Sequence, residues 1–575
     1  MSLNVATTAE ILNGIRDVFK NAEEWRSRGL DKSYQLLVRC AEACEKVMNQ
    51  RLSFVCSQTG FTVHSVLEHT FVVISRALLE YMLVLSKTSK PATSEKQITM
   101  INGFSAEQFF PRSDVWIDSI VFPGVTGMKV IDPYGATSIG HWQARPRNGI
   151  AILLSPFNSP GLTVVAALHM ILEEQIPVIL KVSEKVPKMK VLYEELLAPF
   201  IEARALFVVS GDQSLGQWLI DLPYVIRVHL IGTERAAREI SSRLNPNVYF
   251  TKEVGGITPV IVDPRVRRRN DIIRVARLIH YMANENNGQQ CVSAQVVLVG
   301  EEIKTALEEE LIVLQRAASV VSATATCDQV RYSSSVGPVI EDGTVDRYNR
   351  LVADAKSNGI RTFAAGEVHG RLIPPTMLSA DRLDPERLIV KEEAFSPIYA
   401  LMPVGSAANH EAYMKKTLEF VRQIKGDLAV TYITSERHDE YTWRFCLSLP
   451  HSLIGINAWP GFICAFGPWG SRPGSCSGDT FMGGRFNGDI GRIRKVIFAM
   501  TSLGRQGWYG LPLWEPPWLL PNNLWNARIL EALVRLYLAR ALGRKANLVA
   551  ALAHVAISLV APESSRGLRR FRYRL

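Results

Sequence analysis

Apolar positions up to about residue 85 have the spacing that is typical of helices. In TAEILNGIRDVFKNAEEW, the residues Ile11, Ile15, Val18 and Phe19 recur at helical intervals, which predicts a helix with one buried face. The later stretch SVLEHTFVVISRALLEYMLVLSK approaches the length of a membrane span. Four titratable side chains interrupt it, namely Glu68, His69, Arg76 and Glu80. We therefore expect a buried helix there rather than a span.

From about residue 149 the pattern changes to short apolar runs that alternate with helical spacing. The runs GIAILL, PVILKV, YVIRVHLIG and TPVIV read as buried strands, and helical stretches such as VVAALHMILEEQ lie between them. This alternation predicts a parallel α/β sheet. A similar alternation follows from about residue 290 to residue 435, so the sequence predicts two α/β regions.

The last seventy residues differ from the rest of the chain. GLPLWEPPWLLPNN is too rich in proline to be regular. NARILEALVRLYLARALGRK reads as a basic amphipathic helix, and the apolar stretch that follows it, ANLVAALAHVAISLVA, is short for a transmembrane helix. This tail is either a helical pair that packs on a second copy of the chain or closes the mouth of a binding site, or a segment lying on an anionic membrane surface.

Composition narrows the class of protein. The chain has 575 residues, enough for two to four domains. Its net charge is +10, but residues 506–575 carry ten Lys and Arg against three Asp and Glu. The body is therefore near neutral, which argues against a nucleic-acid-binding protein. Eight cysteines without a CxxC pair give no support for a metal site. Free thiols and the lack of a secretory leader lead us to expect a cytoplasmic, reducing location.

A lone cysteine provides the candidate chemistry. Cys291 stands in NENNGQQCVSA, behind a glycine and two amides. It is either a small buried side chain in a turn or a nucleophile that needs close backbone approach. The stretches SPFNSP, LKVSE, LIGT, KEVGG, NNGQQC and EEAFSP follow one another across the chain. In this order they resemble the aldehyde dehydrogenase superfamily, from roughly Pro133 to Leu503.

The resemblance implies three catalytic residues. Cys291 would be the nucleophile that attacks an aldehyde carbon. Asn158, in SPFNSP, would donate to the oxyanion together with the backbone N–H of Cys291. Glu253, in TKEVGG, would be the general base that activates water to hydrolyse the thioester. Taken alone, Asn158 would be an ordinary turn residue, and Glu253 a solvated surface residue.

The resemblance also implies a site for NAD, with NADP possible. Lys181 and Glu184 would hold the adenosine ribose. Gly232 and Thr233 would receive the diphosphate at a helix N-terminus, although Ala237 replaces a glycine that is common in the family. Two residues that precede a strand, Glu393 and Phe395, would contact the nicotinamide ribose. No residue is assigned to a metal.

By resemblance the fold is α/β and aldehyde-dehydrogenase-like, with six expected segments. The expected segments are an N-terminal helical part of the cofactor domain (1–131), an oligomerisation hairpin (132–148), a Rossmann-like NAD-binding domain (149–254), a catalytic domain (255–480), an oligomerisation strand (481–505) and a basic helical tail (506–575). A small-molecule aldehyde would be the substrate, and the protein would form a homodimer or homotetramer.

The loop IGINAWPGFICAFGPWGSRPGSCSGD departs from the family pattern. Its aromatic residues either line an apolar substrate entrance or pack the loop against the domain; they are Trp459, Phe462, Phe466 and Trp469. Substrate identity therefore cannot be transferred from the family. Two other functions stay open: a CoA-acylating semialdehyde dehydrogenase, and a catalytically idle scaffold with this fold.

Overall fold

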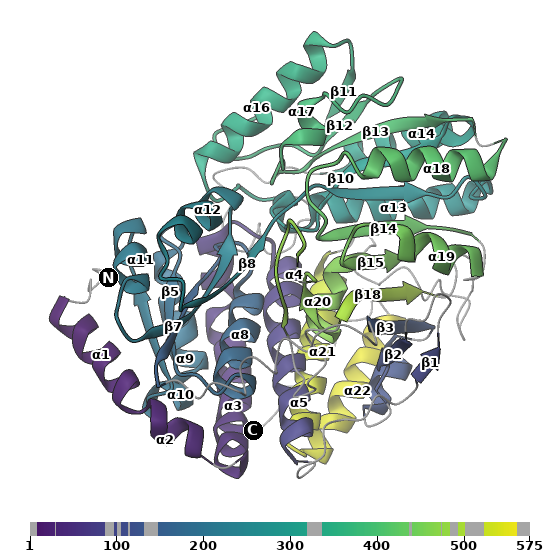
Figure 1. Ribbon diagram of the computed structural model, residues 1–575. Helices are drawn as coiled ribbons and strands as arrows, with labels where there is room; N and C mark the ends of the chain where they lie inside the picture. Colours follow the sequence, from purple (N-terminus) through teal and green to yellow (C-terminus); the bar gives the residue numbers. More distant parts are fainter. Residues whose placement is uncertain are drawn as a thin grey trace.

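The computed structural model contains two large sheets with helices packed around them (Figure 1). It describes residues 8–28, 30–86, 97–99, 105–112, 115–122, 124–131, 148–318, 336–406, 408–435, 440–472, 474–482, 493–500 and 523–560. The predicted α/β class is confirmed. The hairpin expected at 132–148 lies outside the described residues, except for its last position.

The smaller sheet has five parallel strands in the order β6-β5-β4-β7-β8. Its strands are β4 (Ile150–Leu154), β5 (Val178–Val182), β6 (Leu206–Ser210), β7 (Val225–Gly232) and β8 (Tyr249–Val254). Because helices cover both faces, β4 and β5 are almost continuously apolar, as buried parallel strands are. The segment 149–254, expected to form the cofactor domain, contains this whole sheet.

The larger sheet has eleven strands. In spatial order they are β1 (Gln97–Thr99), β2 (Ser105–Phe110), β3 (Val125–Ile131), β18 (Ile493–Met500), β15 (Leu453–Ile456), β14 (Ala429–Ile433), β9 (Thr258–Val262), β10 (Ala294–Gly300), β13 (Ile398–Gly405), β12 (Thr376–Ser379) and β11 (Arg361–Ala364). The strands from β18 to β12 run parallel, whereas β1, β2, β3 and β11 are antiparallel to their neighbours. A separate two-stranded ribbon joins β16 (Trp469–Gly470) to β17 (Phe481–Met482).

Two sequence-based boundaries differ from this arrangement. The segment 1–131 was expected to be helical, but residues 97–131 contribute β1, β2 and β3 to the larger sheet. Strand β18, expected to belong to a separate oligomerisation element, pairs with β3 and β15 and continues the same sheet. The sequence signal is weak here because β1 is three residues long and β3 contains a glycine and a lysine, which interrupt strand periodicity.

Helices fill the space around and between the sheets (Figure 1). They are α1 (Thr8–Lys20), α2 (Ala22–Ser27), α3 (Leu30–Thr59), α4 (Val63–Val66), η1 (Leu67–Val72), α5 (Val73–Ser86), α6 (Trp116–Val121), α8 (Pro160–Leu168), η3 (His169–Glu173), η4 (Pro187–Met189), α9 (Lys190–Leu196), α10 (Ala198–Glu202), α11 (Gln213–Ile220), α12 (Glu234–Arg243), α13 (Arg269–Asn284), η5 (Glu285–Gly288), α14 (Glu301–Ala317), α16 (Asp342–Ser357), α17 (Leu388–Lys391), α18 (His410–Val421), α19 (Glu440–Ser448), η6 (Pro460–Phe462), α20 (Ile463–Phe466), α21 (Asn523–Ala541) and α22 (Lys545–Val560). Of these, η1 and η3 are π-helical turns, and η4, η5 and η6 are 3₁₀ helices.

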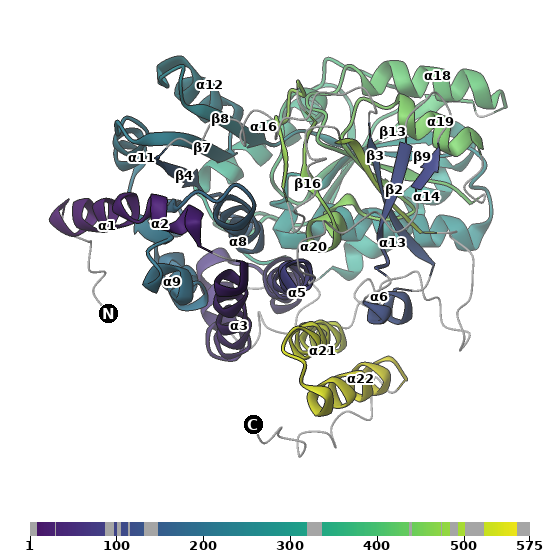
Figure 2. The same ribbon diagram turned by 60° about the horizontal axis from the view of Figure 1, so that its bottom comes forward.

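The C-terminal tail folds back onto the N-terminal helices. Helix α21 lies beside α5 in both views and also contacts α3 and η1 (Figures 1 and 2). Its apolar side chains are buried in this contact, and Arg535 pairs with Glu45 at 2.9 Å. The apolar face of α21 is therefore covered by helices of its own chain, which argues against the membrane-surface alternative for this helix.

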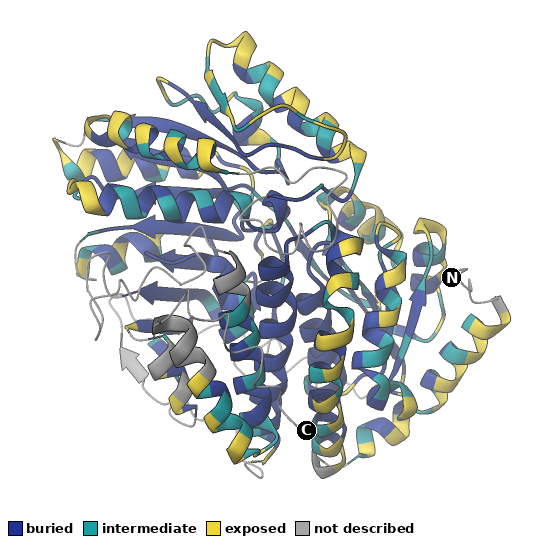
Figure 3. Cartoon of the chain, turned by 180° about the vertical axis from the view of Figure 1, so that it is seen from behind, coloured by how far each residue is buried: buried dark blue, intermediate teal, exposed yellow. Residues whose placement is uncertain are grey.

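The apolar run noted in the sequence is also part of the core. Among the described residues, Val63–Ser86 is the helical run that is long and apolar enough to cross a membrane. Most of it is buried among other helices, which Figure 3 shows as dark blue at the centre of the molecule. Burial of this kind is what a core helix of a globular domain shows.

Candidate active site

The predicted site residues gather where the two sheets meet. Asn158, Lys181 and Glu253 follow or end parallel strands of the smaller sheet, so they share its carboxyl edge. Cys291 comes just before β10 and Glu393 shortly before β13, and these neighbouring strands place both residues at the amino edge of the larger sheet. Strand β8 leads into β9 through three residues. The two edges therefore face each other across a short connection.

The loop before Cys291 has an unusual backbone that only certain residues tolerate. Asn286, Asn287 and Gly288 have φ values of 50°, 57° and 68°, in the left-handed region. A side chain on Gly288 would collide with the backbone of Ser396. The Asn287 side chain bonds to three backbone groups: it donates to the carbonyls of Gly60 and Pro338 and accepts from the N–H of Gly337. The amides and the glycine noted in the sequence therefore build a turn that presents Cys291.

The surroundings of Cys291 keep its thiol protonated. The side chain is half-buried, and Thr258 donates to the Cys291 carbonyl at 3.4 Å. Burial raises the pKa of the thiol well above its usual value, and the nearby carboxyls of Glu253 and Glu393 raise it further. A thiolate here therefore needs a proton acceptor close by.

Glu253 has the properties of such an acceptor. It lies in β8 with only 4% of its surface exposed. The indole N–H of Trp469 donates to one of its oxygens, while the other oxygen has no hydrogen-bond partner. Burial raises the pKa of Glu253 to about 7, against the smaller opposite effect of the Trp469 hydrogen bond. A carboxyl with this pKa can both take and release a proton near neutrality.

Asn158 is held against the loop that precedes Cys291, called here the nucleophile loop after its predicted role (residues 285–291). It follows β4 and is buried, and its Nδ2 donates to the carbonyl of Gln289 at 2.8 Å. An asparagine amide carries two N–H groups. Gln289 lies two residues before Cys291, so this bond holds the Asn158 amide near the cysteine. The second N–H of the amide is then oriented to donate to another group.

On the cofactor side, Glu393 packs closely against the connection between the sheets. A side chain on Gly255 would collide with the Glu393 carboxyl, and the N–H of Gly256 donates to that carboxyl. Burial raises the pKa of Glu393 to about 7, although Arg347 and Lys425 act in the opposite direction. Its Oε1 is buried without a hydrogen-bond partner, so it is available to accept from a ligand hydroxyl.

Phe395 connects this cofactor side to the Asn158 loop. Its φ of 51° is left-handed, which is strained for an aromatic residue. Its ring lies 5.7 Å from that of Phe157 in an edge-to-face arrangement. Phe157 precedes Asn158, so Phe395 packs against the loop that carries Asn158.

Four predicted cofactor residues form a second group along the same sheet edge. Lys181 ends β5 with a buried side chain, and burial lowers its pKa despite the nearby Glu184 and Asp212. Gly232 ends β7, and Thr233 caps α12 by accepting from the N–H of Ala236 at 3.2 Å. Strand β5 carries Lys181 and is three strands away from β8, which carries Glu253. At the usual spacing between strands, the two strands are about 14 Å apart. The second group is therefore separate from Cys291 and spread along the edge.

The aromatic loop packs inward. All four aromatic side chains are buried, with at most 6% of their surface exposed. Trp459 donates to the carbonyl of Val292 at 2.8 Å, and Trp469 reaches Glu253. The packing alternative describes these residues better than the entrance alternative.

Two residues interact with the site in ways that the sequence did not predict, namely Trp469 and Cys464. The bond from Trp469 to Glu253 follows from the rule that a buried indole N–H seeks an acceptor, but the sequence does not name the acceptor. Cys464, in α20, lies near enough to Cys291 and Glu253 to interact with both electrostatically. No motif marked it.

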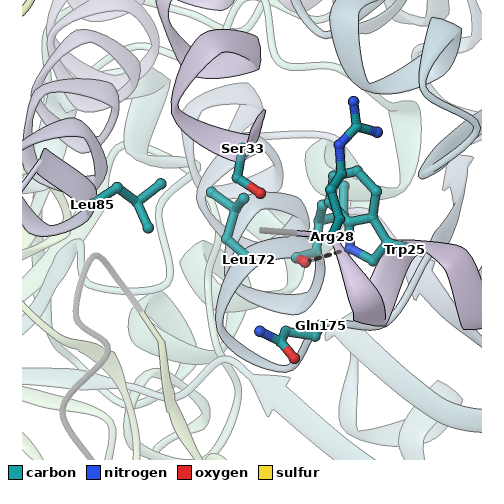
Figure 4. Close-up of a pocket in the computed structure, with 7 residues that line it drawn as sticks. Trp25, Arg28, Ser33, Leu85, Leu172 and Gln175 are labelled. Atoms are coloured by element: carbon teal, nitrogen blue, oxygen red, sulfur yellow. Dashed lines mark hydrogen bonds between the residues drawn. The ribbon is translucent and has the colours of Figure 1, made fainter. Parts of the chain in front are cut away.

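A small surface pocket lies elsewhere in the fold (Figure 4). Its lining comes from the N-terminal helices, from η3 and from the residues just after η3, and includes Trp25, Arg28 and Gln175. The Trp25 indole donates to the carbonyl of Ile171 at 3.0 Å at its wall. None of the predicted site residues lines this pocket, so it does not bear on the chemistry at Cys291.

The sequence is similar to several characterised enzymes. A coniferyl aldehyde dehydrogenase of a Pseudomonas species is 29% identical over 259 residues, which are 44% of this chain and 50% of that protein. A mitochondrial succinate-semialdehyde dehydrogenase of Arabidopsis thaliana is 25% identical over 319 residues, 54% of this chain and 56% of that protein. The chain thus spans about half the length of these relatives.

Solved structures and a family model agree. An NADP-dependent glyceraldehyde-3-phosphate dehydrogenase from Bacillus halodurans, complexed with NADP, has a TM-score of 0.62 at 17% identity, covering 87% of this chain and 92% of that one. An NAD-dependent aldehyde dehydrogenase from Sinorhizobium meliloti has a TM-score of 0.61 at 18% identity, covering 88% and 89%. The model of the aldehyde dehydrogenase family matches residues 126–414. This chain therefore belongs to the aldehyde dehydrogenase family.

Proposed function

We propose that this protein oxidises an aldehyde to a carboxylic acid with NAD or NADP, through a thioester on Cys291. The observation that supports this most is the convergence of three groups. A cysteine, an oriented amide and a buried carboxyl with a pKa of about 7 meet where the two sheet edges face each other. Few other reactions use all three groups together.

Each residue has a distinct task in the proposed reaction. Glu253 takes the thiol proton, directly or through one water, because its pKa of about 7 leaves it largely ionised just above neutrality. Cys291 Sγ then attacks the aldehyde carbon, and Asn158 with the Cys291 N–H stabilises the oxyanion. After oxidation to the thioester, Glu253 gives the thiol proton up to solvent and then takes a proton from the water that attacks the thioester carbon. The C–S bond breaks, which releases the acid, and the Cys291 thiolate regains a proton from Glu253.

The residues present fit a nicotinamide dinucleotide. The buried, unpartnered Oε1 of Glu393 suits a ribose hydroxyl, and Lys181 with Glu184 stands at the strand end where the second ribose would bind. When bound, the cofactor supplies the hydride acceptor. The exposed Glu184 carboxylate disfavours a 2′-phosphate, so we propose NAD ahead of NADP. Neighbouring folds have been solved with either cofactor.

We further propose that the protein forms a homo-oligomer and lies in a reducing, cytoplasmic location. If it also contacts a membrane surface, we propose that α22 and the residues after it make that contact. No disulfide joins the seven cysteines that the structure describes, which agrees with this proposed location. Light scattering on the purified protein would test the assembly, because a monomer at micromolar concentration contradicts it. Sedimentation with anionic vesicles would test the membrane contact.

The function is tested by following the absorbance of reduced nicotinamide with aromatic aldehydes and semialdehydes, the classes named among the relatives. Turnover is expected for the wild type and for Cys446→Ala, a matched control with its thiol buried in the core. Cys291→Ala should lose activity by at least about 1000-fold. Turnover that requires coenzyme A would favour the acylating alternative. Absence of turnover under both conditions would favour the idle scaffold.

A further inference from the structure

A second polar cluster lies below the nucleophile loop, inside the helical core. Glu68 and His69 belong to the π-helical turn η1, a kind of turn that is frequent at functional sites. Glu285 begins η5, the start of the loop that ends at Cys291. One ligand atom from each of the three residues lies within 4.8 Å of the others. All three side chains are buried, with 4–7% of their surface exposed.

One of the converging atoms, Glu68 Oε1, is buried without a hydrogen-bond partner. The other two, His69 Nε2 and Glu285 Oε1, lie 3.5 Å from each other and make no hydrogen bond to any other group. The second oxygens of the two carboxylates are held: Tyr281 donates to Glu68 Oε2 at 2.6 Å, and His64 Nε2 lies 3.1 Å from Glu285 Oε2. A buried polar atom without a partner is rare because it costs about 1–3 kcal/mol. Glu68 Oε1 beside this long His69–Glu285 pair therefore indicates a place where a bound cation would satisfy all three atoms.

We propose that Glu68, His69 and Glu285 bind a divalent transition-metal ion, for which Zn²⁺ is the probe. Imidazole and carboxylate ligands suit such ions. Two ligands about 2.1 Å from a tetrahedral zinc lie about 3.4 Å apart, and His69 Nε2 and Glu285 Oε1 are 3.5 Å apart. Tyr281 and His64 orient the carboxylates from behind, as outer partners do in metal sites.

A similar cluster elsewhere in the chain, in which His169 Nδ1 likewise makes no hydrogen bond, contains a cation of its own. His169 lies between Glu173 and Glu174, at 3.2 and 3.4 Å. There Arg227 binds Glu174 at 3.0 Å, and Tyr81 donates to Glu173 at 2.5 Å. A guanidinium thus supplies the positive charge that a metal would supply at Glu68 and Glu285. The His169 cluster serves as the matched control.

The ion would fasten the nucleophile loop to the N-terminal helices. Trp459 packs edge-to-face on His69 and Tyr281, at 5.1 and 5.6 Å. Its indole also donates to the carbonyl of Val292, next to Cys291. Because Trp459 contacts both His69 of the cluster and the backbone next to Cys291, the ion would position the loop.

The test measures metal content and Tm of the full-length protein after chelation, Zn²⁺ loading and desalting. We expect about one zinc per chain, and a Tm that rises on loading, in the wild type, Cys291→Ala and His169→Gln. Glu68→Gln and His69→Gln should weaken zinc binding by more than about tenfold. No retained zinc in the wild type would overturn the proposal, as would loss of zinc in Cys291→Ala, which would indicate thiolate binding.

Cobalt(II) gives a second measurement in case the variants fold poorly. In the wild type we expect Co²⁺ to give visible d–d absorption without a thiolate charge-transfer band, because the proposed ligands are nitrogen and oxygen. Competition by Zn²⁺ should abolish that absorption. A thiolate band, or no absorption at all, would contradict the site. Both measurements are independent of catalytic turnover, so they do not depend on the proposed reaction.

Discussion

Glu253 and Glu174 are carboxylates beside the same five-stranded sheet, and their surroundings differ in kind; Glu253 is buried, and the side chain of Glu174 is 13% exposed. Burial alone would raise the pKa of Glu174, but Arg227 and His169 outweigh it and lower the pKa below the usual range. Glu253 accepts from the neutral indole of Trp469, and its pKa is raised to about 7. Glu174 therefore stays ionised at neutral pH and is paired with Arg227, whereas Glu253 changes its charge near neutral pH.

The largest expected effect tests the reactive region. Glu253→Gln should lower kcat by about 10²–10⁴-fold, because a positioned base is worth roughly that much. If Glu253 acts mainly in thioester hydrolysis, rapid mixing should still show a first burst of reduced nicotinamide. The exposed Glu239→Gln serves as the control and should turn over normally. Unchanged kcat in Glu253→Gln would contradict the assigned role.

The next effect tests the stabilising region. Glu174→Gln leaves Arg227 buried without its counter-charge, which should lower the free energy of unfolding by about 3–5 kcal/mol. Denaturant titration would measure the loss, and activity per folded molecule should stay the same. Glu202→Gln removes a carboxylate from an exposed pair with Arg39 and should cost less than about 1 kcal/mol. Equal losses of unfolding free energy in the two variants would show that burial does not determine how much these ion pairs stabilise the protein.

The comparison also predicts opposite responses to pH. Glu253 has a raised folded pKa, so its ionisation costs stability progressively as pH rises from about 4.5 to about 7. Glu253→Gln should therefore be more stable than the wild type at pH 8, by up to about 3 kcal/mol, and equal to it near pH 4. For Glu174 the folded pKa is lowered, so its contribution is present at neutral pH and is lost on strong acidification. Denaturant unfolding curves recorded at several pH values would show whether the stability of each protein rises or falls as predicted.

The smallest expected effect concerns the hydrogen bond from the indole of Trp469 to Glu253. Trp469→Phe removes the hydrogen bond that favours ionised Glu253, so the pKa of Glu253 should rise further. The acid limb of the pH–kcat profile should move to higher pH by about one unit. Phe462→Leu, in the same loop, is the matched control and should leave that limb in place. A profile that does not move in Trp469→Phe would show that Glu253 does not set the limb.

Local patterns were sufficient to predict much of the fold. Runs such as VILKV are apolar throughout because a parallel strand between helix layers has no solvent face, and all five of its residues are buried. Strands β1 to β3 were missed because they pair antiparallel at the margin of the larger sheet and carry polar residues. They join the sheet through β3, which pairs with β18, a strand that lies far along the chain.

The site was predictable as far as motifs identify residue types. Cys291, Asn158 and Glu253 stand in short stretches with their own signatures, and the structure brings these stretches together. Trp469 and the Glu68–His69–Glu285 cluster were not predicted, because each depends on contacts between distant segments. In the sequence, Glu68 and His69 only interrupt an apolar helix, and no local rule connects them with Glu285.

The docking of α21 on the N-terminal helices has a consequence for synthesis on the ribosome. Arg535 and its partner Glu45 are 490 residues apart in the sequence. At about 10 residues per second, α3 and α5 emerge roughly 50 seconds before the helix that covers them. During that interval their apolar surface must be shielded by the unfinished chain or by chaperones. Nascent chains should therefore remain vulnerable to aggregation until α21 has left the exit tunnel.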